Sequence, residues 1–450
     1  MSLRLSSISS APAESAPLPP EFRHWRQNLV VLWTTQFLTN IAFSISLPFC
    51  AYFVRELSPG ASEERVRMYA ALSAMMPQLA YTICAPLWGW VADRFGRKRM
   101  ILRATFGGCL ALLLMSFAQN AWQFLWLRLF QGMLTGSVTA SLTLISATTP
   151  SEKQGFAMGA MSSAVFAGDM SGLFIGGLLA SHFGYRNSFR ISSVLLAFCT
   201  VLVIALVHET FKAVKSMGKG NSWAKIGAVW GVLGPAMPVM ILVTVAGLAQ
   251  LYDGSQAALY IEQLNGLGFT GKELCTSLIM GAGSLGAVTA GFTVSRLIDR
   301  HPFFIGIFSG VFCAFTMLAM AILPDILPMS PRVDLGWLGV SEATATPCVL
   351  GLLPLRFLMV FGAGTITPIC HAWISKVTLP AHRGMMFGMS LAFRAVGASV
   401  TNIVAGLVAA GISLRAVYWT GPVFFLLFAL LIWLFQRQIQ ERCEFVLKHG

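Results

Sequence analysis

Charged residues are scarce in this sequence. Asp, Glu, Lys and Arg make up 11% of the 450 residues, whereas a soluble protein typically carries about 25%. Apolar residues make up 56% of the chain, more than a core surrounded by water can hide. Lipid must therefore surround part of the protein. The alternating pattern of an outer-membrane barrel is also missing, which leaves an all-α polytopic membrane protein.

Several motifs that carry chemistry are absent too. The nine cysteines form no CxxC pair or Cys/His cluster, so neither a disulfide framework nor a metal site is indicated. No Walker motif, HExxH motif or Ser/His/Asp grouping in a family context is present, so we expect neither an ATP-driven pump nor an enzyme. Residues 1–27 lack the apolar core of a signal peptide and are expected to form a disordered cytoplasmic tail.

Twelve apolar runs are long enough to cross a bilayer of about 30 Å. They cover residues 28–53, 68–92, 101–119, 121–148, 155–181, 186–208, 237–261, 274–295, 303–323, 350–375, 384–411 and 415–436. The long connection 209–236 is expected to be a central cytoplasmic loop. It divides the chain into an N-terminal six-helix bundle (28–208) and a C-terminal one (237–436), followed by a cytoplasmic tail (437–450).

The basic residues predict the orientation of these spans. With both termini in the cytoplasm, the inner segments together with the span ends next to them hold 20 Lys and Arg residues, and the outer segments with their adjoining span ends hold 8. Such an excess on the inner side is typical of membrane proteins. It also accounts for the net charge of +13, so membrane lipid rather than nucleic acid is the expected partner.

The two halves repeat one another at fixed offsets. Arg128 and Gly136 recur as Arg356 and Gly364, and the pair Gly89/Arg94 recurs with an offset of 202. One insertion, the outer segment 324–349, reconciles the offsets of the earlier and later pairs. A duplicated six-helix unit is common in secondary transporters, so we expect two pseudo-symmetric bundles.

Three groups of residues in the first half form ordered motifs. The loop after the second span is expected to act as a conformational switch, and a glycine stripe in the fifth span is expected to pack against another helix. Between them, the fourth span carries an arginine that is costly to bury in lipid, Arg128, followed by Gln131. The switch residues are Gly89, Asp93, Arg94, Gly96 and Arg97, and the packing residues are Gly159, Gly168, Gly172, Gly176 and Gly177.

These motifs resemble signatures of the major facilitator superfamily. The loop is similar to G-x-x-x-D-R-x-G-R-R/K, Arg128 and Gln131 to the R-x-x-Q-G of proton-coupled members, and the glycines to the antiporter signature of the drug-export branch. Two positions depart: Ser295 replaces Asp in the second copy of the loop, and Leu173 replaces the Pro of the antiporter pattern. The resemblance implies a monomeric drug:proton antiporter of a bacterial inner membrane, without a cofactor.

Polar residues recur at helical spacing in the first, fourth, seventh and tenth spans, which line the central cavity in the resembled fold. Asp169 and Asp253 are the two carboxylates well inside spans, and each is a candidate for proton coupling or for binding a cationic substrate. The alternative for both is a structural ion pair, with Arg394 as a possible partner. The residues expected at the cavity or in proton coupling are Asp253, Asp169, Arg128, His371, Arg394, Arg356, Gln36, Asn40, Gln131, Gln250 and Tyr260.

The expected function is export of small organic compounds, driven by the proton gradient and carried out by alternating access. Uptake of one metabolite or siderophore is the alternative within transport, and Leu173 favours it slightly. A membrane-bound enzyme and a transporter-like sensor without turnover are the alternatives from other classes. The sequence leaves the substrate and the direction of transport open.

Overall fold

The structure, a computed structural model, describes residues 24–150, 154–209, 222–266, 271–336, 343–378 and 383–449. Nearly all of these residues are helical. Eight segments of the described chain are long and apolar enough to cross a membrane. The remaining expected spans are helical as well, so the all-α architecture is confirmed.

The first half contains the helices α1 to α7 and one short 3-10 helix, η1. Their bounds are α1 Trp25–Ser46, η1 Leu47–Phe49, α2 Cys50–Glu56, α3 Glu63–Phe95, α4 Arg97–Met115, α5 Ala121–Leu134, α6 Ser137–Thr148 and α7 Gln154–Leu206. Helix α7 covers the fifth and sixth spans, which are separated by a non-helical residue, Gly184 (φ 75°).

The second half contains α8 to α15 and a two-stranded hairpin. Their bounds are α8 Ser222–Gln250, α9 Ala257–Asn265, α10 Lys272–Arg300, α11 Pro302–Ile326, β1 Val333–Asp334, β2 Thr344–Ala345, α12 Pro347–Val377, α13 Arg383–Gly411, α14 Leu414–Thr420 and α15 Pro422–His449. The strands are antiparallel, with Val333 opposite Ala345.

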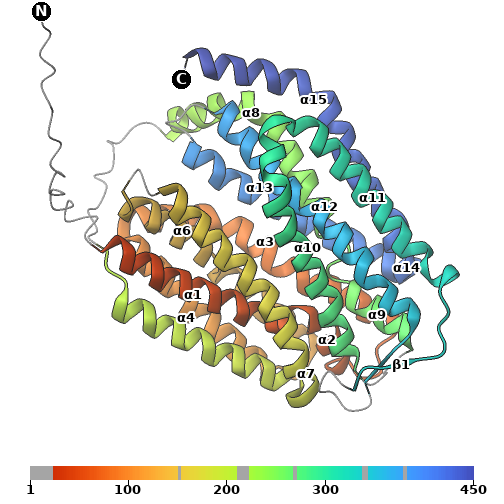
Figure 1. Ribbon diagram of the computed structural model, residues 1–450. Helices are drawn as coiled ribbons and strands as arrows, with labels where there is room; N and C mark the ends of the chain where they lie inside the picture. The colour runs from red at the N-terminus through yellow and green to blue at the C-terminus, as the bar shows by residue number, and fades with distance from the viewer. Residues whose placement is uncertain are drawn as a thin grey trace, which may run out of the picture.

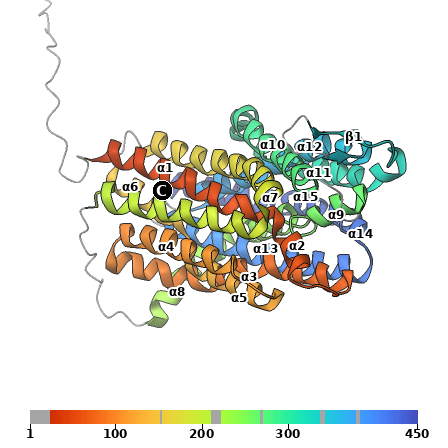
Figure 2. The same ribbon diagram turned by 90° about the horizontal axis from the view of Figure 1, so that it is seen from below.

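In Figure 1 the helices of the first half gather toward the lower left and those of the second half toward the upper right, and Figure 2 shows the same molecule from below. The expected twelve spans in two six-helix bundles are thereby confirmed. Helices α3 and α13, and likewise α7 and α10, meet across the interface between the halves. The described ends of the chain, α1 and α15, lie at one end of the helices, and the hairpin lies at the other (Figure 1).

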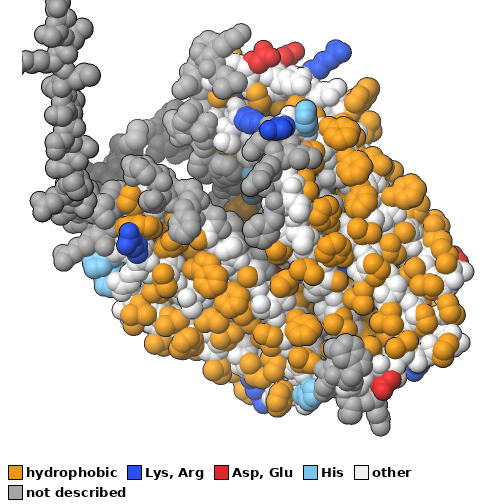
Figure 3. Space-filling view, viewed as in Figure 1, with side chains coloured by type: hydrophobic (Ala, Val, Ile, Leu, Met, Phe, Trp, Pro, Cys, Tyr) orange, Lys and Arg blue, Asp and Glu red, His pale blue; other side chains and the backbone are white. Residues whose placement is uncertain are grey.

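Apolar side chains cover the middle of the face shown in Figure 3, and the charged side chains lie toward its two ends. Phe304, Phe308 and Phe315 of α11 are among the exposed ones, at 72%, 58% and 73% exposure. Large apolar side chains at such exposure are stable when lipid surrounds them. The surface therefore agrees with a chain that spans a membrane.

Three of the expected spans are broken helices. The first is interrupted by η1, the fourth by Thr135 and Gly136, and the seventh by residues 251–256. Gly136 has φ 117°, a conformation that disfavours any residue with a side chain. These spans were expected to be continuous, because an apolar run has the same composition whether or not its helix is interrupted.

Helix α8 begins at Ser222, inside the segment 209–236 that was expected to be a loop. Pro235 and Pro238 lie within this helix, which is tolerated in membrane helices because neighbouring groups satisfy the freed carbonyls. The rest of the expected loop, 210–221, and residues 1–23 of the expected tail lie outside the described residues.

Candidate functional site

A cavity of about 370 Å³ lies between the two halves. Its volume falls within the range of small-molecule sites. The first half contributes most of its wall, from α1 to α3 and α5, and the second half contributes the turn after α8 and one residue of α13. The lining residues are Phe43, Leu47, Pro48, Cys50, Ala51, Ala70, Ser73, Ala74, Pro77, Gln78, Tyr81, Arg128, Gln131, Thr135, Leu251, Gly254, Ser255 and Asn402.

The breaks in the three interrupted spans all reach this cavity. Leu47 and Pro48 of η1, Thr135 after α5, and Leu251 in the turn after α8 lie on its wall. Interrupted helices expose backbone groups, and in membranes these are tolerated only where protein or a watery cavity surrounds them. The broken helices therefore mark the polar centre of the molecule.

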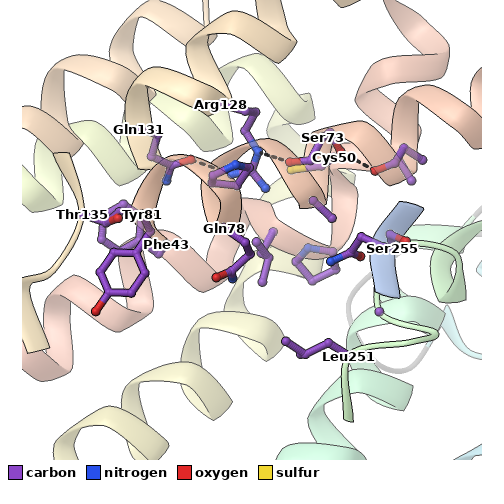
Figure 4. Close-up of a pocket in the computed structure, with 18 residues that line it drawn as sticks. Phe43, Cys50, Ser73, Gln78, Tyr81, Arg128, Gln131, Thr135, Leu251 and Ser255 are labelled. Atoms are coloured by element: carbon purple, nitrogen blue, oxygen red, sulfur yellow. Dashed lines mark hydrogen bonds between the residues drawn. The ribbon is translucent and has the colours of Figure 1, made fainter. Parts of the chain in front are cut away.

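Arg128 lies on the cavity wall with its side chain almost fully buried, at 3% exposure. Its Nε donates to the carbonyl oxygen of Ser73 (3.1 Å), and its Nη1 donates to Oε1 of Gln131 (2.7 Å). Figure 4 shows Arg128 between these two residues, with Leu251 and Ser255 of the second half on the opposite side. Both neighbours accept a hydrogen bond, and neither carries a charge.

Of the eleven side chains expected at the cavity or in proton coupling, Arg128 and Gln131 line this cavity. Helix α3 contributes Ser73, Pro77 and Tyr81 on one face, together with Gln78, and none of these was expected there. Their spacing of four residues along the second span was a signal that could have identified them.

The polar stripe of α1 does not line the cavity, in contrast to the expectation for Gln36 and Asn40. Ser44 donates a hydrogen bond to Oδ1 of Asp169 on α7 (2.9 Å), and Asn40 donates to the backbone oxygen of Gln36 (2.7 Å). The stripe therefore faces another helix. A polar face inside lipid requires partners, and a neighbouring helix supplies them as well as water does.

The glycine stripe of α7 lies against α1. A Cβ atom at Gly168 would meet the carbonyl oxygen of Phe37 at 2.5 Å, and one at Gly172 would meet that of Ile41 at 2.7 Å. Gly176 approaches Ile45 in the same way, whereas Gly177 lies against Ser277 of the second half. Small residues thus let two helix backbones approach closely. Gly159 lies outside the described side chains.

Asp253, which is 0% exposed, forms an ion pair with Arg356 of α12. Its partner is therefore Arg356 and not Arg394. Neither Asp253 nor Arg356 lines the cavity. The pair is internal to the second half and neutralises one of the three arginines that the sequence places within spans.

A second polar group in this half is centred on Gln250 at the end of α8. Its Nε2 donates to the carbonyl oxygen of Ala363 (2.7 Å), and its Oε1 accepts from Nη2 of Arg394 (3.0 Å) and from Thr367 (3.3 Å). His371, which is half-buried on α12, interacts electrostatically with Arg394. This group joins α8, α12 and α13 outside the cavity wall.

Tyr260 of α9 is buried at 1% exposure. Its hydroxyl donates to the carbonyl oxygen of Met320 (3.1 Å), and its ring packs on Tyr418 with the centroids 4.3 Å apart. It therefore lies in the core of the second half and does not line the cavity.

The expected switch loop is described in part. Gly96 has φ 94° and separates α3 from α4. Gly89, Asp93 and Arg94 lie within α3, and the structure describes only their helical backbone. The N-terminus of α4 is bound by Glu209, which accepts from the backbone nitrogens of Arg97 and Lys98 (2.9 Å each). The carboxylate satisfies two amides that a helix start leaves unpaired.

The two halves are bonded to each other at the hairpin end. Arg55 of α2 forms an ion pair with Glu262 of α9, which is 1% exposed, and Lys272 of α10 lies 3.4 Å from the same carboxylate. Tyr52 donates to the carbonyl oxygen of Ala258 (2.7 Å). Residues 50 and 51, on the cavity wall, directly precede Tyr52, so these bonds join the two halves next to the cavity.

A second set of bonds joins α3 to α13 and to the turn before α9 at the same end. Arg67 donates to the carbonyl oxygen of Ala409 (2.8 Å), and its own carbonyl oxygen accepts from Gln256 (3.2 Å). Within the described ranges, no group of three His, Cys, Asp or Glu side chains lies close enough together to hold a metal ion.

Comparisons with known proteins agree with this architecture. A family model described as Major Facilitator Superfamily matches residues 32–354 and 335–443. A multi-drug resistance efflux pump PmrA homolog from Lactococcus lactis is 31% identical over 400 residues, which covers 87% of this chain and 91% of the relative. The multidrug resistance protein MdtG from Yersinia enterocolitica is 31% identical over 426 residues, 93% of this chain and 95% of the relative.

Solved structures share the fold at low sequence identity. A bacterial homolog of the human lysosomal transporter Spinster, in an inward-facing and occupied conformation, superposes with a TM-score of 0.71 at 12% identity and covers 94% of this chain and 99% of its own. A D-xylose-proton symporter superposes with a TM-score of 0.68 at 14% identity, over 90% and 97% of the two chains.

Proposed function

The chain belongs to the Major Facilitator Superfamily, a family of secondary transporters and not of enzymes, and from this premise we propose that it exports small organic compounds in exchange for protons. The observation that carries the proposal is the cavity between the halves. It lies at the level where three spans are broken, and bonds between the halves lie next to it on one side. A midplane site between two bundles suits transport by alternating access. One relative named as a multi-drug resistance efflux pump and another named as a multidrug resistance protein support export.

We place both termini in the cytoplasm of a bacterium and the chain in its inner membrane, as a monomer. In this orientation the hairpin and the Arg55–Glu262 pair face outward, and the bonds between the halves lie on the outer side of the cavity. A compound dissolved in the cytoplasm or the inner leaflet then enters from the opposite side. Opening of the outer side requires the bonds of Arg55, Tyr52 and Arg67 to the second half to break.

Asp169 is the proposed proton site. Ser44 supplies its one hydrogen bond among the described residues, and no cation lies within ion-pair distance of it in that part of the chain. Asp253, by contrast, is ion-paired with Arg356, so Asp169 is the carboxylate within the spans that remains available to exchange a proton. Each proton that crosses 100 mV releases ~2.3 kcal/mol, enough for a roughly 50-fold gradient of substrate.

The test is substrate uptake by energised inside-out vesicles that contain the full chain. Uptake that stops when a protonophore collapses the gradient is expected for the wild type. Asp169→Asn is expected to abolish this uptake, and the matched change Asp334→Asn in the exposed hairpin is expected to leave it intact. Unchanged proton-driven uptake by Asp169→Asn would remove this carboxyl group from coupling, and the lack of any proton-driven uptake would refute the export proposal.

Uptake of one specific metabolite is the second candidate, because Leu173 stands where the antiporter pattern has Pro. Leu173 is helical within α7, so this span continues without the kink that a proline would introduce. The direction of transport separates the two candidates. Accumulation in right-side-out vesicles, and none in inside-out vesicles, would favour the importer.

A further inference from the structure

One charged side chain lies among the described residues that line the cavity. Of the residues that line it in the described part of the chain, Arg128 alone is charged, and the other polar side chains are Ser, Thr, Tyr, Gln and Asn. Neither of the two carboxylates within spans reaches the wall: Asp253 is paired with Arg356, and Asp169 is bonded to Ser44. The cavity therefore presents a net positive charge to a ligand.

The guanidinium of Arg128 is left without a counter-charge. Its two hydrogen bonds go to a backbone oxygen and to an amide oxygen, and its Nη2 donates to no described residue. A buried cation is costly unless a negative group compensates it. An anion that reaches the cavity would supply the missing charge and a third acceptor.

In the second half, the arginine that corresponds to Arg128 is neutralised by a carboxylate. Arg356, the repeat counterpart of Arg128, has its own carboxylate in Asp253. The offset of 202 that relates Gly89 to Gly291 places Ala51 at the position of Asp253, and Ala51 lines the cavity. The second half thus holds the internal ion pair of Asp253 and Arg356. At the corresponding positions of the first half, Ala51 and Arg128 both line the cavity.

Further donors surround the cavity. Gln78 and Tyr81 both lie on the cavity wall, and their side chains carry hydrogen-bond donors. The remaining wall is largely apolar, with Phe43, Leu47 and Leu251 among its larger side chains. A ligand that fits has an anionic end for Arg128 and an apolar body for these side chains.

We propose that the cavity selects amphipathic organic carboxylates, whose carboxylate accepts a hydrogen bond from Nη2 of Arg128. The proposal rests on the proposed function, because it takes this cavity as the substrate site. It narrows the substrate class to anions and excludes the lipophilic cations for which a cavity carboxylate would be needed. Charge-assisted hydrogen bonds of this kind are among the stronger polar contacts in proteins.

A matched set of three probes tests the proposal: naphthylbutyrate, naphthylbutanol and naphthylbutylammonium. They share one ring and one linker and differ in charge at neutral pH. Binding is measured by equilibrium dialysis against nanodiscs of zwitterionic lipid that hold the full chain, with empty nanodiscs as the blank. We expect the butyrate to bind about tenfold more tightly than the alcohol, and the ammonium to bind more weakly than both.

Two variants assign the preference to Arg128. Arg128→Gln is expected to make the butyrate and the alcohol bind equally. Gln131→Glu retains the arginine and places a carboxylate beside its Nη1, so it supplies an internal counter-charge and should remove the preference without removing a buried cation. Arg186→Gln is the control, because Arg186 is an arginine of the same half that does not line the cavity. It should retain the wild-type preference.

Three outcomes would overturn the proposal: equal or tighter binding of the ammonium to the wild type, a preference for the butyrate that survives in both cavity variants, or no saturable binding of any probe. The measurement needs no gradient and no transport. A failure here with intact proton-driven export would therefore refute the charge selectivity alone. Selective binding of the butyrate without proton-driven export would support the binding site and refute the proposed function.

Discussion

Arg55 of α2 and Glu262 of α9 form an ion pair that joins the two halves at the hairpin end, and the carboxylate of Glu262 is 1% exposed. Arg55 also contacts Glu63 of its own half at 2.7 Å, where the carboxylate is 47% exposed. One arginine thus has a buried partner across the interface and an exposed partner within its own half. The effect of removing the buried carboxylate can therefore be compared with the effect of removing the exposed one.

We predict that Glu262→Gln loosens the contact between the two halves at this end. Loss of the carboxylate leaves Arg55 and Lys272 without their shared buried counter-charge, which is strongly unfavourable. Hydrogen exchange of the amides in α2 should become about tenfold faster, equivalent to ~1.4 kcal/mol. Glu63→Gln is the control and should change exchange little, because exposed ion pairs contribute about 0–1 kcal/mol. Equal effects of the two variants would contradict a role for the buried pair in this contact.

Gly172→Ala should destabilise the first half. The added methyl group would meet the carbonyl oxygen of Ile41 at 2.7 Å, so α7 must move away from α1. Overpacking of this kind costs about 1–3 kcal/mol, and the thermal unfolding midpoint measured by circular dichroism should fall. Gly388→Ala in α13 is the control, since no atom lies within 4 Å of its added Cβ. If the unfolding midpoint of Gly172→Ala were at or above that of the control, the close approach of α7 and α1 would not contribute to the stability of the protein.

The Asp253–Arg356 pair should behave as a structural unit. Asp253→Asn leaves Arg356, which is 12% exposed, as an uncompensated charge, and such a loss costs about 3–5 kcal/mol. The double variant Asp253→Asn with Arg356→Gln should regain most of the stability in the same unfolding assay. Asp325→Asn breaks an exposed pair with Arg415 and serves as the control. A stable Asp253→Asn protein that lost only proton-driven uptake would instead make Asp253 the coupling site.

Glu209→Ala should release the start of α4. The carboxylate accepts from the amides of Arg97 and Lys98, and comparable caps contribute about 0.5–2 kcal/mol. Hydrogen exchange in the first turn of α4 should therefore become faster, whereas Glu441→Ala at an exposed position of α15 should have no effect there. Unchanged exchange in α4 would mean that other groups hold this helix start.

The sequence predicted the spans well because long apolar runs are a strong and local signal. All twelve expected runs correspond to helices, and the Arg128 and Gln131 pair does line the cavity. The breaks were not predicted. Gly136 and Pro48 stand out in the sequence, but the chain has 42 glycines and 20 prolines, and which of them interrupt a helix depends on the helices packed around them.

The sequence also did not indicate whether a polar helix face points toward the cavity or toward another helix. Gln36 and Asn40 were expected at the cavity because a polar stripe within lipid needs partners. Instead, Asn40 bonds to the backbone of its own helix, and the stripe packs against α7, where Ser44 donates to Asp169. The same pattern is compatible with water or with another helix, so periodicity alone does not decide between them. The bonds of Arg55 and Tyr52 were missed because their partners lie more than 200 residues away along the chain.

Asn265, the last residue of α9, ties this short helix to the segment that follows the hairpin. Its side chain donates to the carbonyl oxygen of Thr344 (2.9 Å) and accepts from the backbone nitrogen of Thr346 (2.5 Å), directly before α12. Helix α9 is therefore mechanically linked to the start of α12. If the proposed opening separates Glu262 from Arg55, the start of α12 is expected to move together with α9.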